Sequence, residues 1–169
     1  MLFRSFADES DPARGVVFDG RLAEDFKLTT GTWVHAGALR VGALAACSPV
    51  LQDAIVAGAD REFIGLLCWL NAAGCQKLIG AGAAALPDLT RHPVVREHVR
   101  RAVIQWNAAH PGSSERIGRV LLLPDAPSID ANEITDKGYI NQRLALERRT
   151  ADVARLFAAE PDGEVMTIS

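Results

Sequence analysis

Residues 93–109 show the clearest hydrophobic period of the chain. Apolar side chains recur there three, four and seven positions apart, while arginine and glutamate occupy the other positions; the apolar set is Val95, Val99, Ala102, Val103 and Trp106. Side chains at this spacing share one face of an α-helix. The segment is therefore predicted to be an amphipathic helix with one buried stripe and a solvated arginine face.

Three shorter runs favour buried β-strands. They read "LQDAIVAGA", "FIGLLCWLN" and "RIGRVLLLP" at 51–59, 63–71 and 116–124. The last two are nearly continuous in apolar residues, as expected for strands covered on both faces. Near the N-terminus, "GVVFDGR" predicts a short strand ending in a turn at Asp19-Gly20. "FKLTTGTWVHAG" alternates around Gly31 and predicts a hairpin.

The remaining segments predict short helices and connectors. "ALRVGALAACSP" indicates a helix that ends before Pro49, and "AAGCQKLIGAG" a small one that runs out in glycines. "GAGAAALPD" is interpreted as a connector. A final helix is expected to begin near Tyr139 and to bury Leu146, Val153, Leu156 and Phe157. This order predicts an α+β fold: a small central β-sheet flanked by helices, with an N-terminal β-hairpin. Residues 1–14 are expected to form an arm, 15–160 one domain and 161–169 a tail.

Composition narrows the classes of protein that fit. The chain has 169 residues, 49% of them apolar and 23% charged, which suits one globular domain. A net charge of -3 gives no reason to expect a nucleic acid or an anionic membrane as partner. No apolar run approaches the ~20 residues of a membrane span, and no signal-peptide core is visible, so we expect a cytoplasmic location.

Cysteine and histidine offer little chemistry. Cys47, Cys68 and Cys75 show no C-x-x-C pairing and are interpreted as buried structural thiols. The four histidines are scattered without metal-ligand spacing. We therefore predict no metal site formed by this chain alone.

Two polar loops are not explained by packing. They read "FDGRLAEDFKLTTGTW" at 18–33 and "PSIDANEITDKGYINQR" at 127–143. Polar loops held between core elements commonly carry function. The simpler alternatives are a hairpin with a solvated edge and a helix entry with a surface lysine.

Both loops resemble signature segments of one family. "FDGRLAEDFKL" and "EITDKGYINQR", about 110 residues apart, are similar to two segments of the adenylate-forming superfamily, which includes acyl- and aryl-CoA synthetases. The sequence of these segments is most similar to the feruloyl-CoA synthetase branch, and the resemblance covers residues 15–158. The resemblance implies only the small C-terminal domain of such an enzyme, either separately expressed, truncated or encoded by a free-standing gene. The large N-terminal domain, with its phosphate loop and its acid and nucleotide pocket, is not in this sequence.

The resemblance also implies an activity. The complete enzyme would be an ATP-dependent, AMP-forming acid–CoA ligase that makes an acyl-adenylate and, after this domain rotates, a coenzyme A thioester. The large N-terminal domain would be its partner and would hold most of ATP and Mg. Hydroxycinnamic acids such as ferulate are the expected substrates. The isolated chain is expected to be inactive. The alternative is a free-standing, non-catalytic module that binds a nucleotide or a partner.

The resemblance assigns roles to individual residues. Lys137 matches the catalytic lysine of adenylation, and Arg21 matches the arginine beside the nucleotide ribose. The turn at Gly31, Thr32 and Trp33 matches the lining of the CoA tunnel.

Three departures from the family pattern accompany these matches. The hinge position holds Ala23 instead of Asp or Lys, which leaves Glu24 and Asp25 as alternatives for the polar role. The paired glycines of the tunnel turn are replaced by Thr30-Gly31-Thr32. Around the lysine, Asp136 precedes it and Gly138 follows it.

Overall fold

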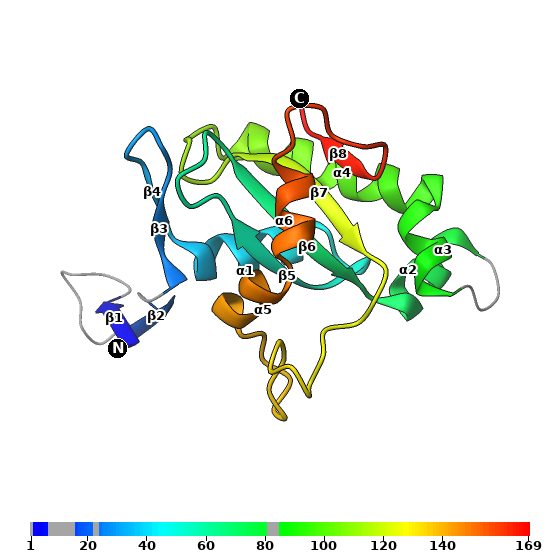
Figure 1. The fold of residues 1–169 in the computed structure, drawn as a ribbon, viewed down its shortest axis with the longest axis horizontal. Helices are drawn as coiled ribbons and strands as arrows, with labels where there is room; N and C mark the ends of the chain where they lie inside the picture. The colour runs from blue at the N-terminus through cyan, green and yellow to red at the C-terminus, as the bar shows by residue number, and fades with distance from the viewer. Residues whose placement is uncertain (1, 7–15, 22–23, 81–84) are drawn as a thin grey trace.

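A four-stranded sheet forms the centre of the computed structural model, which describes residues 2–6, 16–21, 24–80 and 85–169 (Figure 1). Its strands lie in the order β5 (Leu51–Ala57), β6 (Ile64–Leu70), β7 (Ile117–Leu123), β8 (Val165–Thr167). β5 and β6 are antiparallel, β6 and β7 parallel, and β7 and β8 antiparallel. The parallel pair requires a long crossover, which helices supply.

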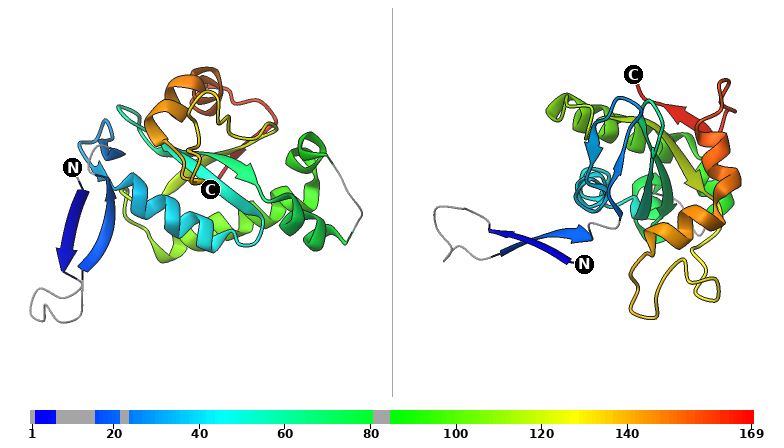
Figure 2. Two further views of the ribbon diagram at one scale, coloured as in Figure 1. Left: turned by 90° about the horizontal axis from the view of Figure 1, so that it is seen from below. Right: turned by 60° about the vertical axis from the view of Figure 1, so that its left-hand side comes forward.

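Helices cover both faces of the sheet, giving three layers (Figure 2). One layer holds α1 (Ala36–Ala46), α2 (Ala72–Ile79), α3 (Leu86–Arg91) and α4 (Pro93–Ala109), of which the last three form the crossover from β6 to β7. The other layer holds α5 (Gln142–Arg148) and α6 (Thr150–Leu156). The loop that contains Lys137 joins β7 to α5.

The core consists of two apolar clusters, one on each face of the sheet. Alternate strand residues point to opposite faces. Val56, Leu66 and Val120 therefore pack with α1 and α4, whereas Ile55, Leu67 and Leu121 pack with α5 and α6. All seven residues of β6 are buried, which confirms the prediction of a strand covered on both faces.

Two antiparallel pairs precede the central sheet. β1 (Leu2–Phe6) pairs with β2 (Val16–Arg21), and β3 (Phe26–Lys27) pairs with β4 (Trp33–Val34) around Gly31. The expected hairpin over 26–37 is confirmed, and with it the α+β fold. α1, α2, α4 and the three core strands also lie where the sequence predicts them.

Several local predictions differ from the structure. β2 continues through Asp19 and Gly20 to Arg21, so the turn predicted at Asp19-Gly20 is wrong. The register shifts there, and the flanking residues Phe18 and Arg21 pair with Arg4 and Leu2 of β1. Residues 2–6 are a strand, although they were expected to belong to an irregular arm. The expected tail contributes β8, and the final helix is two helices that meet at Arg149. The domain limits themselves stay a prediction.

The connector predicted at 80–88 is partly helical. α3 begins at Leu86 with Pro87 in its first turn, a position where proline is favoured. Residues 81–84 lie outside the described part of the chain. Across the described residues, no helix has the length and apolar character needed to cross a bilayer.

Candidate functional site

Lys137 lies at the tip of a small hairpin between β7 and α5. Its base is the bridge between Ile134 and Ile140. Thr135 closes the turn: its N–H donates to the carbonyl of Tyr139 at 2.9 Å, and its carbonyl accepts from Gly138 N–H at 2.9 Å. Thr135 Oγ1 also accepts from Tyr139 N–H at 3.1 Å. The lysine side chain is exposed, as the sequence predicts for a residue at a loop-to-helix junction.

Gly138 makes this hairpin possible. Its φ of +80° lies in the left-handed region, where a Cβ is strained, and nothing lies within 4 Å of the position that a Cβ would take. The glycine is therefore required by the backbone and not by close packing. Its conformation directs the turn so that Lys137 faces solvent.

Large apolar side chains accompany the lysine. Tyr139 is 67% exposed and Ile129 is 64% exposed, both in the loop 124–141. Sequence reasoning missed them as site residues, although their size within a polar loop was a visible signal. The loop therefore exposes two large apolar side chains as well as a cation.

The second predicted group also comes together in the structure. The N–H of Gly31, whose φ is +82°, donates to the carbonyl of Leu28 at 2.8 Å. Thr32 Oγ1 lies 3.2 Å from Ser113 Oγ. Trp33 is 54% exposed, and Lys27 Nζ lies 4.8 Å from the centre of its ring. Gly31, Thr32 and Trp33 thus form one exposed turn, to which the structure adds Lys27 and Ser113 as neighbours.

The two groups do not form one site. The β3–β4 turn projects at the upper left of Figure 1 and the Lys137 loop at the bottom. Arg21 is the last residue of β2, and its backbone is all that is described. Ala23, which is expected at the hinge position, lies outside the described residues. The carboxylate of Asp25 already has partners within this domain. It accepts a hydrogen bond from Ala36 N–H at 3.2 Å, at the start of α1, and lies 2.8 Å from His35 Nδ1.

The cysteines lack the features of a nucleophile. All three are buried, which confirms the interpretation as structural thiols. Burial raises the pKa of Cys47 to about 12 and raises the pKa of Cys68 as well. A thiolate is the reactive form of cysteine, so burial disfavours the reactive form of these thiols. Within the described ranges, no three His, Cys, Asp or Glu side chains cluster as metal ligands would.

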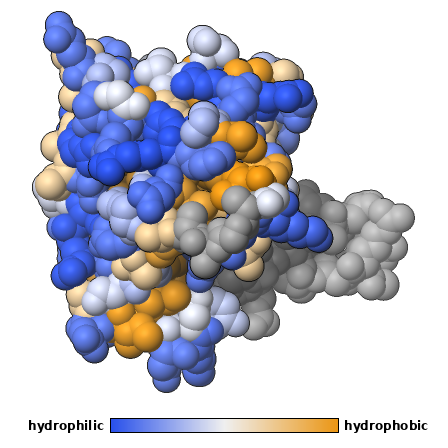
Figure 3. Space-filling model, turned by 90° about the vertical axis from the view of Figure 1, so that its right-hand side faces the viewer, coloured by the Kyte–Doolittle hydropathy of each residue, from blue (hydrophilic) through white to orange (hydrophobic). Residues whose placement is uncertain are grey.

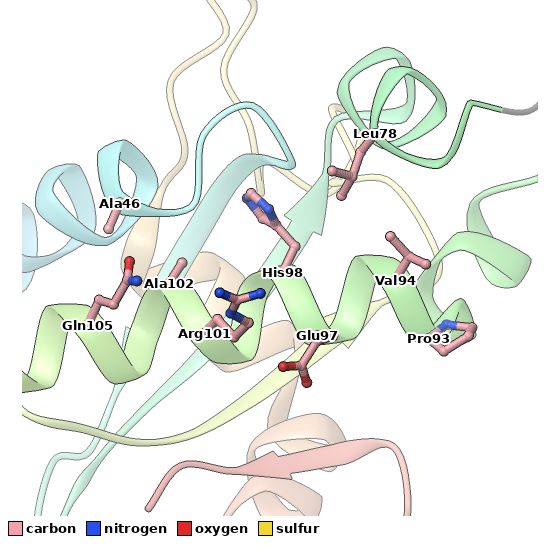
Figure 4. A pocket seen from close by; sticks show the side chains of 9 residues that line it. All are labelled: Ala46, Leu78, Pro93, Val94, Glu97, His98, Arg101, Ala102 and Gln105. Carbon is pink, nitrogen blue, oxygen red and sulfur yellow. The ribbon is translucent and has the colours of Figure 1, made fainter.

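A groove of about 640 Å³ lies between α1, α2 and α4. In Figure 4, Leu78 and Val94 point toward each other across it, while Glu97 points away. The face of the molecule seen in Figure 3 is mostly hydrophilic, with separate apolar patches. α4 packs on the sheet face opposite α5 and α6, so the groove is not part of the Lys137 surface.

A smaller hollow of about 410 Å³ lies next to the Gly31 turn. Phe63, Ser113, Arg116 and Arg119 are among its lining residues. Ser113 also contacts Thr32, so this hollow and the turn are continuous.

The family of this fold follows from the sequence comparison. The sequence model of the family described as AMP-binding enzyme C-terminal domain matches residues 28–161. The chain belongs to this family. The match includes Lys137 and the Gly31 turn, whereas Arg21 and Ala23 precede it.

Solved structures agree with the family. The AMP-binding C-terminal domain resembles the A domain of a carboxylic acid reductase from Segniliparus rugosus, solved with AMP and a co-purified carboxylic acid (TM-score 0.63, 16% identity, 86% of this chain and 21% of that one). It also resembles an A-PCP didomain from the same organism (0.60, 16%, 86% and 19%). A third similar structure is the adenylation domain of a Mycobacterium chelonae carboxylate reductase (0.65, 14%, 86% and 21%). The chain thus spans about a fifth of each of these proteins.

One sequence similarity points elsewhere. The chain is 30% identical over 158 residues to the phosphoribosylformylglycinamidine synthase subunit PurQ of Halobacterium salinarum, covering 89% of this chain and 68% of that protein. The family model covers residues 28–161, most of the chain, and the family assignment rests on that match. The solved structures add the likeness in fold.

Proposed function

We propose that this domain serves as the catalytic lid of an AMP-forming aryl-acid–CoA ligase similar to feruloyl-CoA synthetases. Lys137 supplies the cation for adenylation, and the Gly31 turn guides the thiol in the second step. The proposal rests on the exposed lysine at the tip of a hairpin closed by backbone hydrogen bonds, in a domain of the AMP-binding family.

The chemistry of the first step suits an exposed lysine. When an acid attacks ATP, negative charge builds at the α-phosphate, and a preorganised cation there stabilises the transition state. A lysine ammonium is a compact charge on a flexible stem. ATP and Mg would be bound mainly by the large adenylation domain, where Arg21 would approach the ribose. Lys137 then needs only to be presented to that domain, which its exposure allows.

The second step places different demands on the domain. The thiol of coenzyme A must reach the acyl-adenylate while solvent is excluded. The Gly31 turn has no side chain at the glycine, and the exposed Trp33 follows Thr32 in the same turn. A pantetheine arm could therefore pass along the backbone and contact an apolar side chain. The turn lies away from Lys137 (Figure 1), so the domain would rotate between the steps, as conformational lids commonly do.

One structural similarity favours a second candidate for the thiol that accepts the acyl group. The A-PCP didomain of the Segniliparus reductase joins its A domain to a further domain. A thiol carried on an attached domain would use the same Gly31 turn, and the first half-reaction would be unchanged.

The test separates the two half-reactions. The chain is joined to the large adenylation domain of a feruloyl-CoA synthetase, and acyl-adenylate formation is followed by pyrophosphate release from ATP and ferulate. Thioester formation is followed separately, from supplied feruloyl-adenylate and CoA. We expect both activities in the joined enzyme and neither in the isolated chain. An isolated chain that turns over unaided, or a joined enzyme that never forms the adenylate, would refute the proposal. In the second case, the alternative of a non-catalytic binding module would gain support.

A further inference from the structure

A buried ion pair lies beneath the Lys137 hairpin. Glu133 is fully buried and Arg149 is 7% exposed. Arg149 Nε donates to Glu133 Oε1 at 2.7 Å, and its Nη2 donates to Oε2 at 3.1 Å. Such a bidentate pair fixes both distance and orientation. Burying two charges is costly unless the pairing is good, so a purely connecting loop would gain little from this pair.

Glu133 also ties the two arms of the loop together. Its carboxylate accepts from Ser128 N–H at 2.7 Å, and its own N–H donates to the Ser128 carbonyl at 2.9 Å. Its carbonyl accepts from Asn141 N–H at 2.8 Å. The outgoing arm at 128 and the returning arm at 141 therefore meet at one residue, four positions before Lys137.

Arg149 connects this loop to the rest of the domain. It lies where α5 ends and α6 begins. Its Nη1 is 2.7 Å from Asp125 Oδ2, at the start of the loop, and its guanidinium lies 5.7 Å from the ring centre of Trp69 in β6. One side chain therefore holds the loop against both the sheet and the helical layer.

Both groups are charged at neutral pH. Burial opposes ionisation of Glu133, but hydrogen bonds from Arg149 and from Ser128 N–H outweigh it and lower its pKa. Burial likewise opposes the charge on Arg149, yet the carboxylates of Glu133 and Asp125 raise its pKa. Arg148 Nε, 3.4 Å from Glu133 Oε2, adds a further cation.

We propose that Glu133 and Arg149 are positioning residues for the adenylation step: they hold the hairpin so that Lys137 projects in a fixed direction when the large domain docks. This inference rests on the proposed function. A displacement of about 1 Å at a reacting group can cost roughly 10²-fold in rate. The geometry of the pair therefore matters to the rate and not only to folding.

The experiment uses Arg149→Lys in the joined enzyme, which keeps the charge but loses the bidentate geometry. We expect acyl-adenylate formation to slow by roughly 10- to 100-fold in kcat, with the KM for ATP and the thioester half-reaction little changed. Hydrogen exchange should rise in residues 128–141. Arg91→Lys is the matched control, because Arg91 at the end of α3 pairs with Glu164 at the surface, outside both candidate loops. It should change neither half-reaction.

A second variant covers the case in which Arg149→Lys does not fold. Glu133→Gln with Arg149→Met removes both charges together, so neither is left buried and unpaired. It should fold and show the same selective loss of adenylation. Equal slowing of both half-reactions would mean that the pair acts only through stability, and no slowing of either would also overturn the inference. Lys137→Ala separates the two claims. If this variant spares adenylation, the proposed function fails. If it selectively loses adenylation while the Arg149 and Glu133 variants are unaffected, the proposed function stands and the positioning role is refuted.

Discussion

The Lys137 loop and the Gly31 turn are two exposed, glycine-containing turns of one domain that are anchored in different ways. The Lys137 loop adds a buried ion pair beneath its hairpin to its own backbone hydrogen bonds. The Gly31 turn has no such pair among its described contacts. Thr29 N–H donates to the Arg61 carbonyl at 2.9 Å, Asp60 N–H donates to the Lys27 carbonyl at 3.0 Å, and Thr32 Oγ1 lies 3.2 Å from Ser113 Oγ. Its two strands have only two residues each.

This difference suits two different tasks. A lysine that meets developing charge needs a fixed direction, which a bidentate side-chain pair provides. A turn that lines a path for a thiol needs a backbone held in place with no bulky side chain at its tip, which glycine and backbone hydrogen bonds provide. Because the two turns project from different sides (Figure 1), one rigid domain can present each of them in turn.

The largest effects are expected when each turn is altered, because each variant should slow a different half-reaction. In the joined enzyme, Lys137→Ala should slow acyl-adenylate formation by about 10²–10³-fold, the typical loss of one preorganised donor. Thioester formation from supplied adenylate should be largely spared. Gly31→Leu should show the opposite selectivity, because a branched side chain at φ +82° strains the turn and projects into the open space beside it. Matching losses in both half-reactions for either variant would show that the two turns are not functionally separate.

A smaller effect is expected at Arg21. In the proposed function, its guanidinium would offer ribose hydroxyls a fixed set of hydrogen-bond donors that lysine cannot copy. Arg21→Ala should raise the KM for ATP in the first half-reaction by about tenfold, the equivalent of one hydrogen bond to a charged group. Arg21→Lys should recover part of this loss at most. A variant that unfolds more easily but keeps its ATP dependence would assign Arg21 to structure alone.

The pH dependence of stability should distinguish the anchors of the two turns. Because the pKa of Glu133 is lowered in the folded domain, its contribution to the unfolding free energy is present above the unfolded pKa and is lost as pH falls through the folded pKa. Denaturant titrations at pH 7 and pH 3 should therefore show a smaller acid-dependent loss in Glu133→Gln than in the wild type. Gly31→Ala, which removes no ionisable group, should leave that loss unchanged. Identical losses in Glu133→Gln and the wild type would exclude the ion pair as an acid-sensitive anchor.

The smallest effect is expected for the stability of Lys137→Ala itself. The side chain is exposed, and exposed substitutions usually change the unfolding free energy by no more than about 0.5 kcal/mol. A cooperative thermal transition within a few degrees of the wild type would agree with this. A large loss would mean that the lysine stabilises the loop, and its effect on adenylation would then need a different explanation.

The sequence alone determined the main elements and the two candidate turns. Strong periodicity decided α4, and continuous apolar runs decided β6 and β7, because burial on one or both faces leaves a direct pattern in the residues. The polar segments around Gly31 and Lys137 were recognisable as loops for the same reason. Weaker patterns gave wrong local structure: Asp19-Gly20 has the composition of a turn, yet it lies inside β2, at a register shift between two residues that pair with β1.

Only the tertiary structure revealed what supports these turns. Glu133 and Arg149 are ordinary polar residues of a loop and a helix junction in the sequence, sixteen positions apart. Nothing in their spacing indicates that the carboxylate is fully buried or that the guanidinium reaches both Asp125 and Trp69. The separation of Lys137 from the Gly31 turn was likewise decided by the fold. A local pattern records how a segment meets solvent, whereas a buried pair between distant segments exists only once the sheet and helices have packed together.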